Sequence, residues 1–119
     1  SGNITQPINN NGLVKAMIVY NPDNNSIDHC FNGITGATTG DCGFSVTAQD
    51  IGVTRIDFLF PVAGRFVSIT PEFDTIIGSS NSNAGANYRR LNSTTIEVFT
   101  FQSGDSNGLD DAGFTLIMY

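Results

Sequence analysis

The strongest strand signal lies at the end of the chain, where residues 94–101 read Thr-Thr-Ile-Glu-Val-Phe-Thr-Phe and residues 112–119 read Ala-Gly-Phe-Thr-Leu-Ile-Met-Tyr. The first run has the two-residue period of a β-strand. Its two faces consist of Ile96, Val98 and Thr100 on one side and Glu97, Phe99 and Phe101 on the other. The second run is apolar on both faces, which predicts a buried strand with the C-terminus inside the fold. Gly, Asp and Asn residues between the runs favour a turn, so we expect a closing hairpin.

The aromatic residues raise a question of packing. If Ile96 and Val98 face the core, Phe99 and Phe101 face outward, where a second layer or another chain would have to cover them. The phenylalanines in question are Phe58, Phe60, Phe66, Phe99, Phe101 and Phe114. Either all of them fill one core, or two or three form a seam in a trimer; we prefer the seam.

Upstream, short apolar runs recur with turn signals between them, which is typical of an antiparallel β-sandwich or a related jelly-roll-like all-β fold. We expect strands in residues 13–20, 27–34, 44–48, 54–60 and 65–70, and a further short strand in residues 72–77. Residues 35–43 and 78–87 predict loops, and residues 88–91 a short edge strand or the end of the second loop. Residues 1–12 predict an arm or linker, with Ser1-Gly2 left by cloning, before a single domain over residues 13–119.

Composition narrows the class of protein. The chain has 119 residues, which fits one domain, and only 13% of them are charged. Polarity comes instead from Asn, Ser, Thr and Gly, a surface common on secreted and virion proteins. The net charge of −6 argues against nucleic acid as a partner, and no apolar run predicts membrane insertion. We expect the chain to be a fragment of a longer protein.

The two cysteines, Cys30 and Cys42, have a spacing compatible with a disulfide across neighbouring strands. Two buried thiols are the alternative, since free cysteine packs as a small hydrophobic residue. A zinc site is not favoured because His29 is the single histidine and no second pair of ligands exists.

Catalytic and metal sites find little support. His29 lies beside Cys30, and adjacent residues on a strand face opposite sides, so they cannot act as a pair. We expect His29 to be a surface or interface residue, and nothing distinguishes Glu72 and Glu97 from solvated charges. The oxygen-rich stretches at residues 23–28 and 105–111 are more typical of turns than of calcium sites. We therefore expect no enzyme activity, metal or cofactor.

The five basic residues are informative because they are scarce: Lys15, Arg55, Arg65, Arg89 and Arg90. The planar fork of arginine suits sulfate and carboxylate groups. Alternation along a strand places Arg89 and Arg90 on opposite sides. The contacts that we predict for an anionic glycan are Arg89, Arg90, Arg65, Lys15, Tyr88 and Asn87, with Tyr88 stacking on a sugar ring. The alternative is ion pairing with Asp57, Glu72, Asp74 or Glu97.

Three stretches together resemble the C-terminal head domains of phage tail fibres. They are Lys15–Asn21, then Thr39–Val46 with Ile56–Phe58 and Arg65–Pro71 as a central hairpin, and finally Thr95–Tyr119 as a closing hairpin. Similar domains cap bacterial collagen-like adhesins of the Legionella type. Met17 stands where the family has Trp, and the loop at residues 78–87 is longer than the family pattern.

The resemblance implies a homotrimer at a bacterial surface or on a virion. We expect a non-enzymatic adhesin head that binds cell-surface glycans, first of all sulfated polysaccharides such as glycosaminoglycans. One alternative is a structural trimerisation cap without ligand. Another is a tail-fibre tip that recognises a neutral surface sugar.

Overall fold

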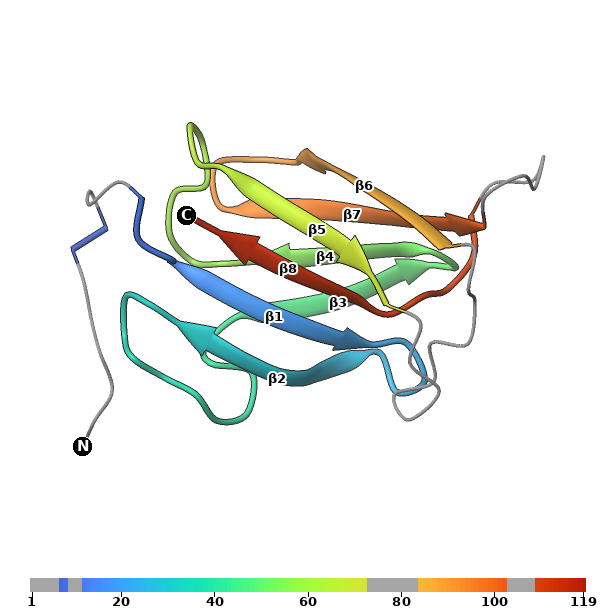
Figure 1. Cartoon of the computed structure of the whole chain (residues 1–119), viewed down its shortest axis with the longest axis horizontal. Helices are drawn as coiled ribbons and strands as arrows, with labels where there is room; N and C mark the ends of the chain where they lie inside the picture. The colour runs from blue at the N-terminus through green and yellow to red at the C-terminus, as the bar shows by residue number, and fades with distance from the viewer. Residues whose placement is uncertain (1–6, 9–11, 73–83, 103–108) are drawn as a thin grey trace.

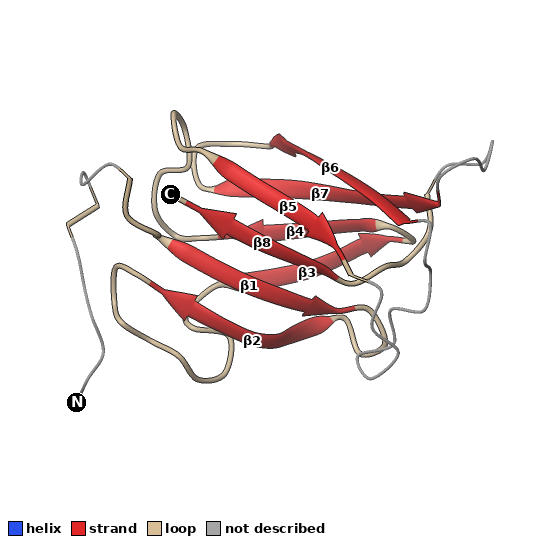
Figure 2. Ribbon diagram, in the orientation of Figure 1, coloured by secondary structure: helices blue, strands red, loops and turns tan. Residues whose placement is uncertain are grey.

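The computed structural model of the chain describes residues 7–8, 12–72, 84–102 and 109–119 (Figure 1). Its eight strands are β1 (Ala16–Asn21), β2 (Ser26–Asn32), β3 (Ser45–Asp50), β4 (Val53–Asp57), β5 (Val67–Pro71), β6 (Ala84–Arg90), β7 (Thr95–Gln102) and β8 (Phe114–Met118). No helix occurs in the described ranges (Figure 2). The predicted all-β class is therefore confirmed.

The strands form two four-stranded antiparallel sheets. We call the sheet with strand order β2-β1-β8-β5 sheet A, and the sheet with order β3-β4-β7-β6 sheet B. The hairpins are β1–β2, β3–β4 and β6–β7, and the chain crosses between the sheets at its other connections. Figure 1 shows the sheets as two layers, as expected for a sandwich.

The predicted closing hairpin is wrong. Strand β7 lies between β4 and β6 in sheet B, whereas β8 lies between β1 and β5 in sheet A. The pair β4 and β5, for which the resemblance implies a hairpin, is split between the sheets in the same way. Turn-forming residues signal that the chain reverses, but they do not show whether the next strand returns to the same sheet.

The inner faces of the two sheets form the core. Ile96, Val98 and Thr100 of β7 are all buried, which confirms the predicted inward face. From sheet A, Phe114, Leu116 and Met118 of β8 meet them with no exposed surface. The burial of β8 therefore follows one face, since Thr115 and Ile117 on the other face are only half-buried.

The six phenylalanines divide into two groups. Phe58, Phe60 and Phe114 are buried in the core. Phe66 is 81% exposed, and Phe99 and Phe101 are half-buried on the outer face of sheet B. The alternative in which all six fill one core is therefore wrong, because three rings lie outside it.

Strand β6 occupies part of the predicted loop at residues 78–87. Gly85 pairs with Phe101 of β7, and a Cβ atom on Gly85 would lie 2.4 Å from Cε2 of that ring. The Phe101 ring thus covers the glycine backbone and leaves no room for a side chain at this position. Glycine lowers the strand propensity of residues 84–87, but the neighbouring strand requires it. The strand predicted at residues 72–77 lies, after Glu72, outside the described residues, as do residues 78–83.

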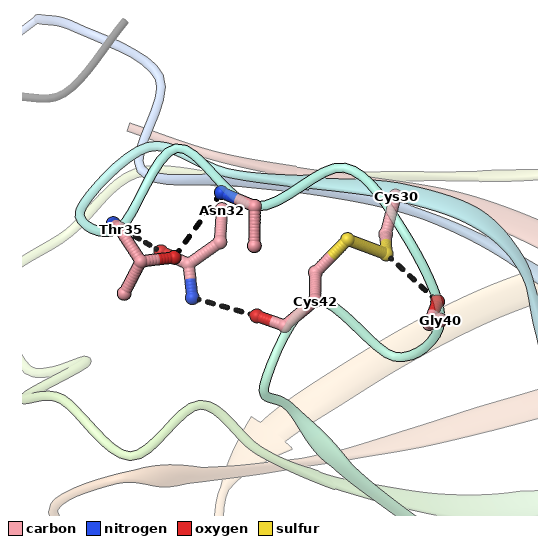
Figure 3. Close-up of a disulfide and its surroundings, with 6 residues drawn as sticks. Cys30, Asn32, Thr35, Gly40 and Cys42 are labelled. Atoms are coloured by element: carbon pink, nitrogen blue, oxygen red, sulfur yellow. Dashed lines mark hydrogen bonds between the residues drawn. A yellow bond between two sulfur atoms is a disulfide. The ribbon is translucent and has the colours of Figure 1, made fainter. Parts of the chain in front are cut away.

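The loop between β2 and β3 is fastened at both ends (Figure 3). Cys30 and Cys42 form a disulfide with a Cα–Cα distance of 6.2 Å, which is one of the two alternatives that their spacing left open. Asn32 donates from Nδ2 to the Cys42 carbonyl at 2.9 Å, and its Oδ1 accepts from Ile34 N at 3.0 Å. The Cys30 sulfur also lies 3.4 Å from the Gly40 carbonyl oxygen, a contact without a donated proton because the sulfur is oxidised.

Candidate functional site

A row of polar side chains crosses the outer face of sheet B. In register across the four strands lie Thr47 of β3, Arg55 of β4, Glu97 of β7 and Arg89 of β6. Registered positions share one face of a sheet, so these side chains are neighbours although they are distant in sequence. We call this surface, with Phe99 and Asn87 of the adjoining row, the arginine face.

Glu97 is the centre of the row. Its Oε2 accepts from Arg55 Nε at 2.8 Å, and its Oε1 accepts from Arg89 Nε at 2.7 Å. The Glu97 side chain is only 3% exposed, whereas those of Arg55 and Arg89 are 39% and 61% exposed. Two guanidinium groups share one carboxylate, so the cluster carries a net charge of +1 (+2 − 1).

Arg89 is held from a second side by an aromatic ring. Its Cζ lies 5.8 Å from the centroid of Phe99, within range of a cation–π contact. Asn87 is exposed and pairs with Phe99 across the β6–β7 ladder. The guanidinium group of Arg89 is therefore held by a carboxylate and an aromatic ring, and Asn87 lies on the same face of the sheet.

The two arginines change the acidity of the buried carboxyl. The hydrogen bond from Arg55 lowers the pKa of Glu97 below its ordinary value, and Arg89 adds to this effect, whereas burial alone would raise the pKa. A lowered folded-state pKa means that the ionised form stabilises the fold. This contribution is complete above the unfolded-state pKa of about 4.3 and is lost as the pH falls through the lowered folded-state value.

Replacement of Glu97 by glutamine should therefore reduce the fall in the free energy of unfolding that occurs when the protein is acidified. At neutral pH we expect a loss of about 1.5–3 kcal/mol, the contribution of a hydrogen bond to a charged group. As the pH falls from the unfolded-state pKa of about 4.3 through the lowered folded-state pKa, the variant should approach the wild type, because the carboxyl of the wild type becomes protonated and both side chains are then neutral. Urea unfolding between neutral pH and pH 3 measures this, with Asp28→Asn as an exposed control. A constant difference at every pH would contradict the assignment.

The predicted ligand contacts fall into separate groups. Arg89 and Asn87 belong to the arginine face, and the pairing of Arg89 with Glu97 is one of the predicted ion pairs. Arg90 and Tyr88 face elsewhere. Arg90 donates from NH2 to the Arg65 carbonyl at 2.7 Å, and its Cζ lies 5.8 Å from the Tyr88 ring centroid. The adjacent arginines thus have different partners, as alternation along β6 predicts.

Arg65 borders an open pocket of about 390 Å³. Its Nε donates to the Pro61 carbonyl and its NH2 to the Ile8 carbonyl, each at 2.8 Å. The pocket is lined by Ile8, Gly12, Ala63, Gly64, Arg65, Phe66 and Tyr119, and we call it the aromatic pocket. The lining includes two exposed aromatic side chains, since Phe66 is 81% and Tyr119 37% exposed.

The prediction of Lys15 as a surface contact is wrong. The residue has no exposed surface, and its Nζ donates to the Leu13 carbonyl at 2.9 Å. Burial lowers the pKa of its ammonium group. Apolar residues on either side of a lysine in a strand give no sign that its side chain will be covered.

Three site residues were absent from the sequence-based set: Arg55, Phe66 and Tyr119. Alternation in residues 54–60 places Arg55 on the outward side, but its position beside Glu97 depends on a pairing between strands 42 residues apart. The exposure of Phe66 depends on the crossing from β4 to β5. Neither feature follows from local periodicity.

The remaining candidates in the described part of the chain lie outside the arginine face. His29 is 71% exposed and lies 3.2 Å from Asp28, while Cys30 is in the disulfide. In the stretch 23–28, side-chain oxygens accept turn hydrogen bonds, as in Ser26 Oγ to Asn24 Oδ1 at 2.6 Å. The described residues contain no cluster of three metal-binding side chains, and most of the stretch 105–111 lies outside them.

Fold and site together define an all-β two-sheet protein with an arginine-bearing outer face. Comparison of the chain with protein-family models, with curated proteins and with solved structures gives no match. Within the ranges described, the structure has no helix that could span a membrane.

Proposed function

We propose that this chain is the non-enzymatic, homotrimeric head of an extracellular attachment protein, on a bacterial surface or a virion, and that it binds anionic glycans. The observation that carries the proposal is the sharing of one buried carboxylate by two arginines. Glu97 neutralises only one of the two charges on the arginine face, and both guanidinium groups remain partly exposed.

The chemistry of this face suits sulfated or carboxylated sugars. An arginine fork binds such groups through paired, charge-assisted hydrogen bonds. Glu97 and Phe99 hold Arg89 in place, which lowers the entropy lost on binding. Three copies around an axis would present the face three times, so weak sites would add up through avidity.

Replacement of Arg89 by glutamine should weaken binding to a sulfated glycosaminoglycan about tenfold, the effect of losing about 1.4 kcal/mol per site. Glutamine keeps a donor for Glu97, so the fold should persist. Arg90→Gln, one position along the same strand but turned away, is the matched control and should bind like the wild type. Calorimetric titration of the three proteins measures the effect. Equal losses in both variants, or loss in Arg90→Gln alone, would refute the assigned face.

A second candidate is a neutral sugar in the aromatic pocket. The exposure of Phe66 favours it, because the C–H groups of a sugar ring pack on the electron-rich face of an aromatic ring. Phe66→Ala should then abolish binding of a neutral glycan and leave binding of the sulfated chain unchanged. If the wild type binds neither glycan, the remaining interpretation is a structural trimerisation cap.

A further inference from the structure

A second group of cations lies at the end of the sandwich where the chain crosses from β4 to β5 (Figure 1). Arg65 donates to the carbonyls of Pro61 and Ile8. Arg90 donates from NH2 to the Arg65 carbonyl and from Nε to the Val62 carbonyl at 3.3 Å. Among the residues that the structure describes, neither guanidinium group forms an ion pair. Backbone carbonyls therefore hold both groups without neutralising their charges.

This end of the molecule has a different charge balance from the arginine face, where Glu97 neutralises one of two cations. Burial is the main cause that lowers the pKa of Lys15, and the positive charge of Arg65 lowers it further. The electrostatic influence of Arg65 thus reaches a neighbouring cation. On a chain with a net charge of −6, such a local excess of positive charge attracts anions to one place.

The aromatic pocket opens beside Arg65, which is half-buried in its wall. The exposed Phe66 follows Arg65 directly in the sequence. Tyr119 N donates to the Phe66 carbonyl at 2.9 Å, so these two residues lie side by side at the ends of β5 and β8. An aromatic ring packs against the C–H groups of a sugar, and a guanidinium group binds a carboxylate. The pocket places both kinds of group next to each other.

We propose that the aromatic pocket binds a single carboxylated sugar residue, with its carboxylate on Arg65 and its ring on Phe66. The backbone bonds of Arg65 use Nε and NH2, which leaves NH1 without a hydrogen-bond partner in the described part of the chain. A neutral sugar in the same pocket would use the aromatic rings alone and leave this charge uncompensated. The volume of about 390 Å³ is near the lower end of the range of about 300–1,000 Å³ for ligand pockets, which suits one ring.

The inference goes beyond the proposed function, because the aromatic pocket is separate from the arginine face and requires neither Arg89 nor a trimer. The test is an NMR titration of the isotope-labelled protein with methyl β-glucuronide. Methyl β-glucoside is the matched neutral probe, since it has a hydroxymethyl group in place of the carboxylate. We expect the glucuronide to bind with a Kd on the order of 1 mM and to shift the amide signals of Phe66 and Tyr119. The glucoside should bind about tenfold more weakly or less.

Three variants locate the binding. Arg65→Gln removes the charge but keeps a donor for the backbone carbonyls, and it should weaken glucuronide binding about tenfold. Phe66→Ala changes an exposed ring with little risk to the fold, and it should also weaken glucuronide binding. Arg89→Gln alters the arginine face alone, so it is the matched control and should bind the glucuronide like the wild type.

Each outcome bears on the inference. Equal affinity for the two probes, or no shift at Phe66 and Tyr119, would overturn it. Unchanged glucuronide binding in both Arg65→Gln and Phe66→Ala would overturn it as well, and so would a loss of binding in Arg89→Gln. A parallel titration with a sulfated glycosaminoglycan tests the proposed function separately. If the glucuronide binds in the pocket but the sulfated chain does not bind, the proposed function fails and the pocket assignment stands.

Discussion

Replacement of Gly52 by alanine is expected to destabilise the protein by about 3 kcal/mol or more, from left-handed strain combined with a steric clash. Gly52 lies in the turn between β3 and β4 with φ at +70°, a conformation that costs little only for glycine. A Cβ atom there would lie 2.6 Å from the Thr100 carbonyl oxygen and 2.9 Å from Asp110 N. Both are backbone atoms, so they cannot turn aside as a flexible side chain would.

Hydrogen bonds fix the surroundings of Gly52. Thr100 N donates to the Gly52 carbonyl at 2.9 Å, and Gly52 N donates to Asp111 Oδ1 at 2.7 Å. The Thr100 hydroxyl donates to the Asp110 carbonyl at 2.6 Å. These bonds tie the β3–β4 turn and β7, both in sheet B, to the segment that leads into β8 of sheet A. Any movement that accommodates a methyl group at Gly52 would therefore break contacts between the sheets.

Gly64→Ala is the matched control for this prediction. Gly64 has φ at +75°, but a Cβ atom on it would meet nothing within 4 Å, so alanine there should cost only the left-handed penalty of about 1 kcal/mol. Urea unfolding of both variants and the wild type gives the comparison. Equal losses of stability at the two positions would contradict the account of a clash at Gly52. If Gly52→Ala fails to fold while Gly64→Ala folds, the account is supported.

Removal of the disulfide should cost about 3 kcal/mol. The bond joins residues 12 apart in sequence, and closure of a loop of this size restricts the unfolded chain by about that amount in the chain-entropy model. The loop is also the crossing from sheet A to sheet B. Asn32 spans the same loop by donating from Nδ2 to the Cys42 carbonyl.

The disulfide prediction is checked by unfolding the protein with and without a reductant. The wild type should lose about 3 kcal/mol on reduction. The double variant Cys30→Ala with Cys42→Ala should show the lower stability under both conditions and no response to the reductant. A wild type whose stability is unchanged by complete reduction would contradict this prediction.

Local pattern was sufficient for the strands but not for their partners. Alternation placed Ile96 and Val98 inward, and the predicted strands in residues 13–70 correspond to β1–β5. The sequence did not show which sheet each strand joins, because the same turn residues occur whether the chain forms a hairpin or crosses to the other sheet. The start of strand β6 was missed because its glycine, Gly85, is not typical of a strand. Gly85 fits there because the Phe101 ring of the neighbouring strand β7 covers it, which the sequence of β6 does not show.

The sequence predicted the candidate site only in part, because local pattern shows which way a side chain points but not which strand lies beside it. Strand period placed Arg89 and Arg90 on opposite sides, and scarcity of basic residues directed attention to arginine. The partnership of Arg55 with Glu97 required the β4–β7 register, and the covering of Lys15 required the packing around the start of β1. Long-range pairing therefore determined which charges are exposed and which are satisfied within the molecule.

Binding of an anionic glycan to the arginine face can be measured by titrating the wild-type protein with a sulfated glycosaminoglycan at low and at physiological salt. A neutral glycan serves as the control. We expect saturable binding of the sulfated chain that weakens as the salt concentration rises, since screening acts on exposed charges. We expect no binding of the neutral chain at this face. Absence of binding to the sulfated chain, or binding that salt leaves unchanged, would contradict the proposed function.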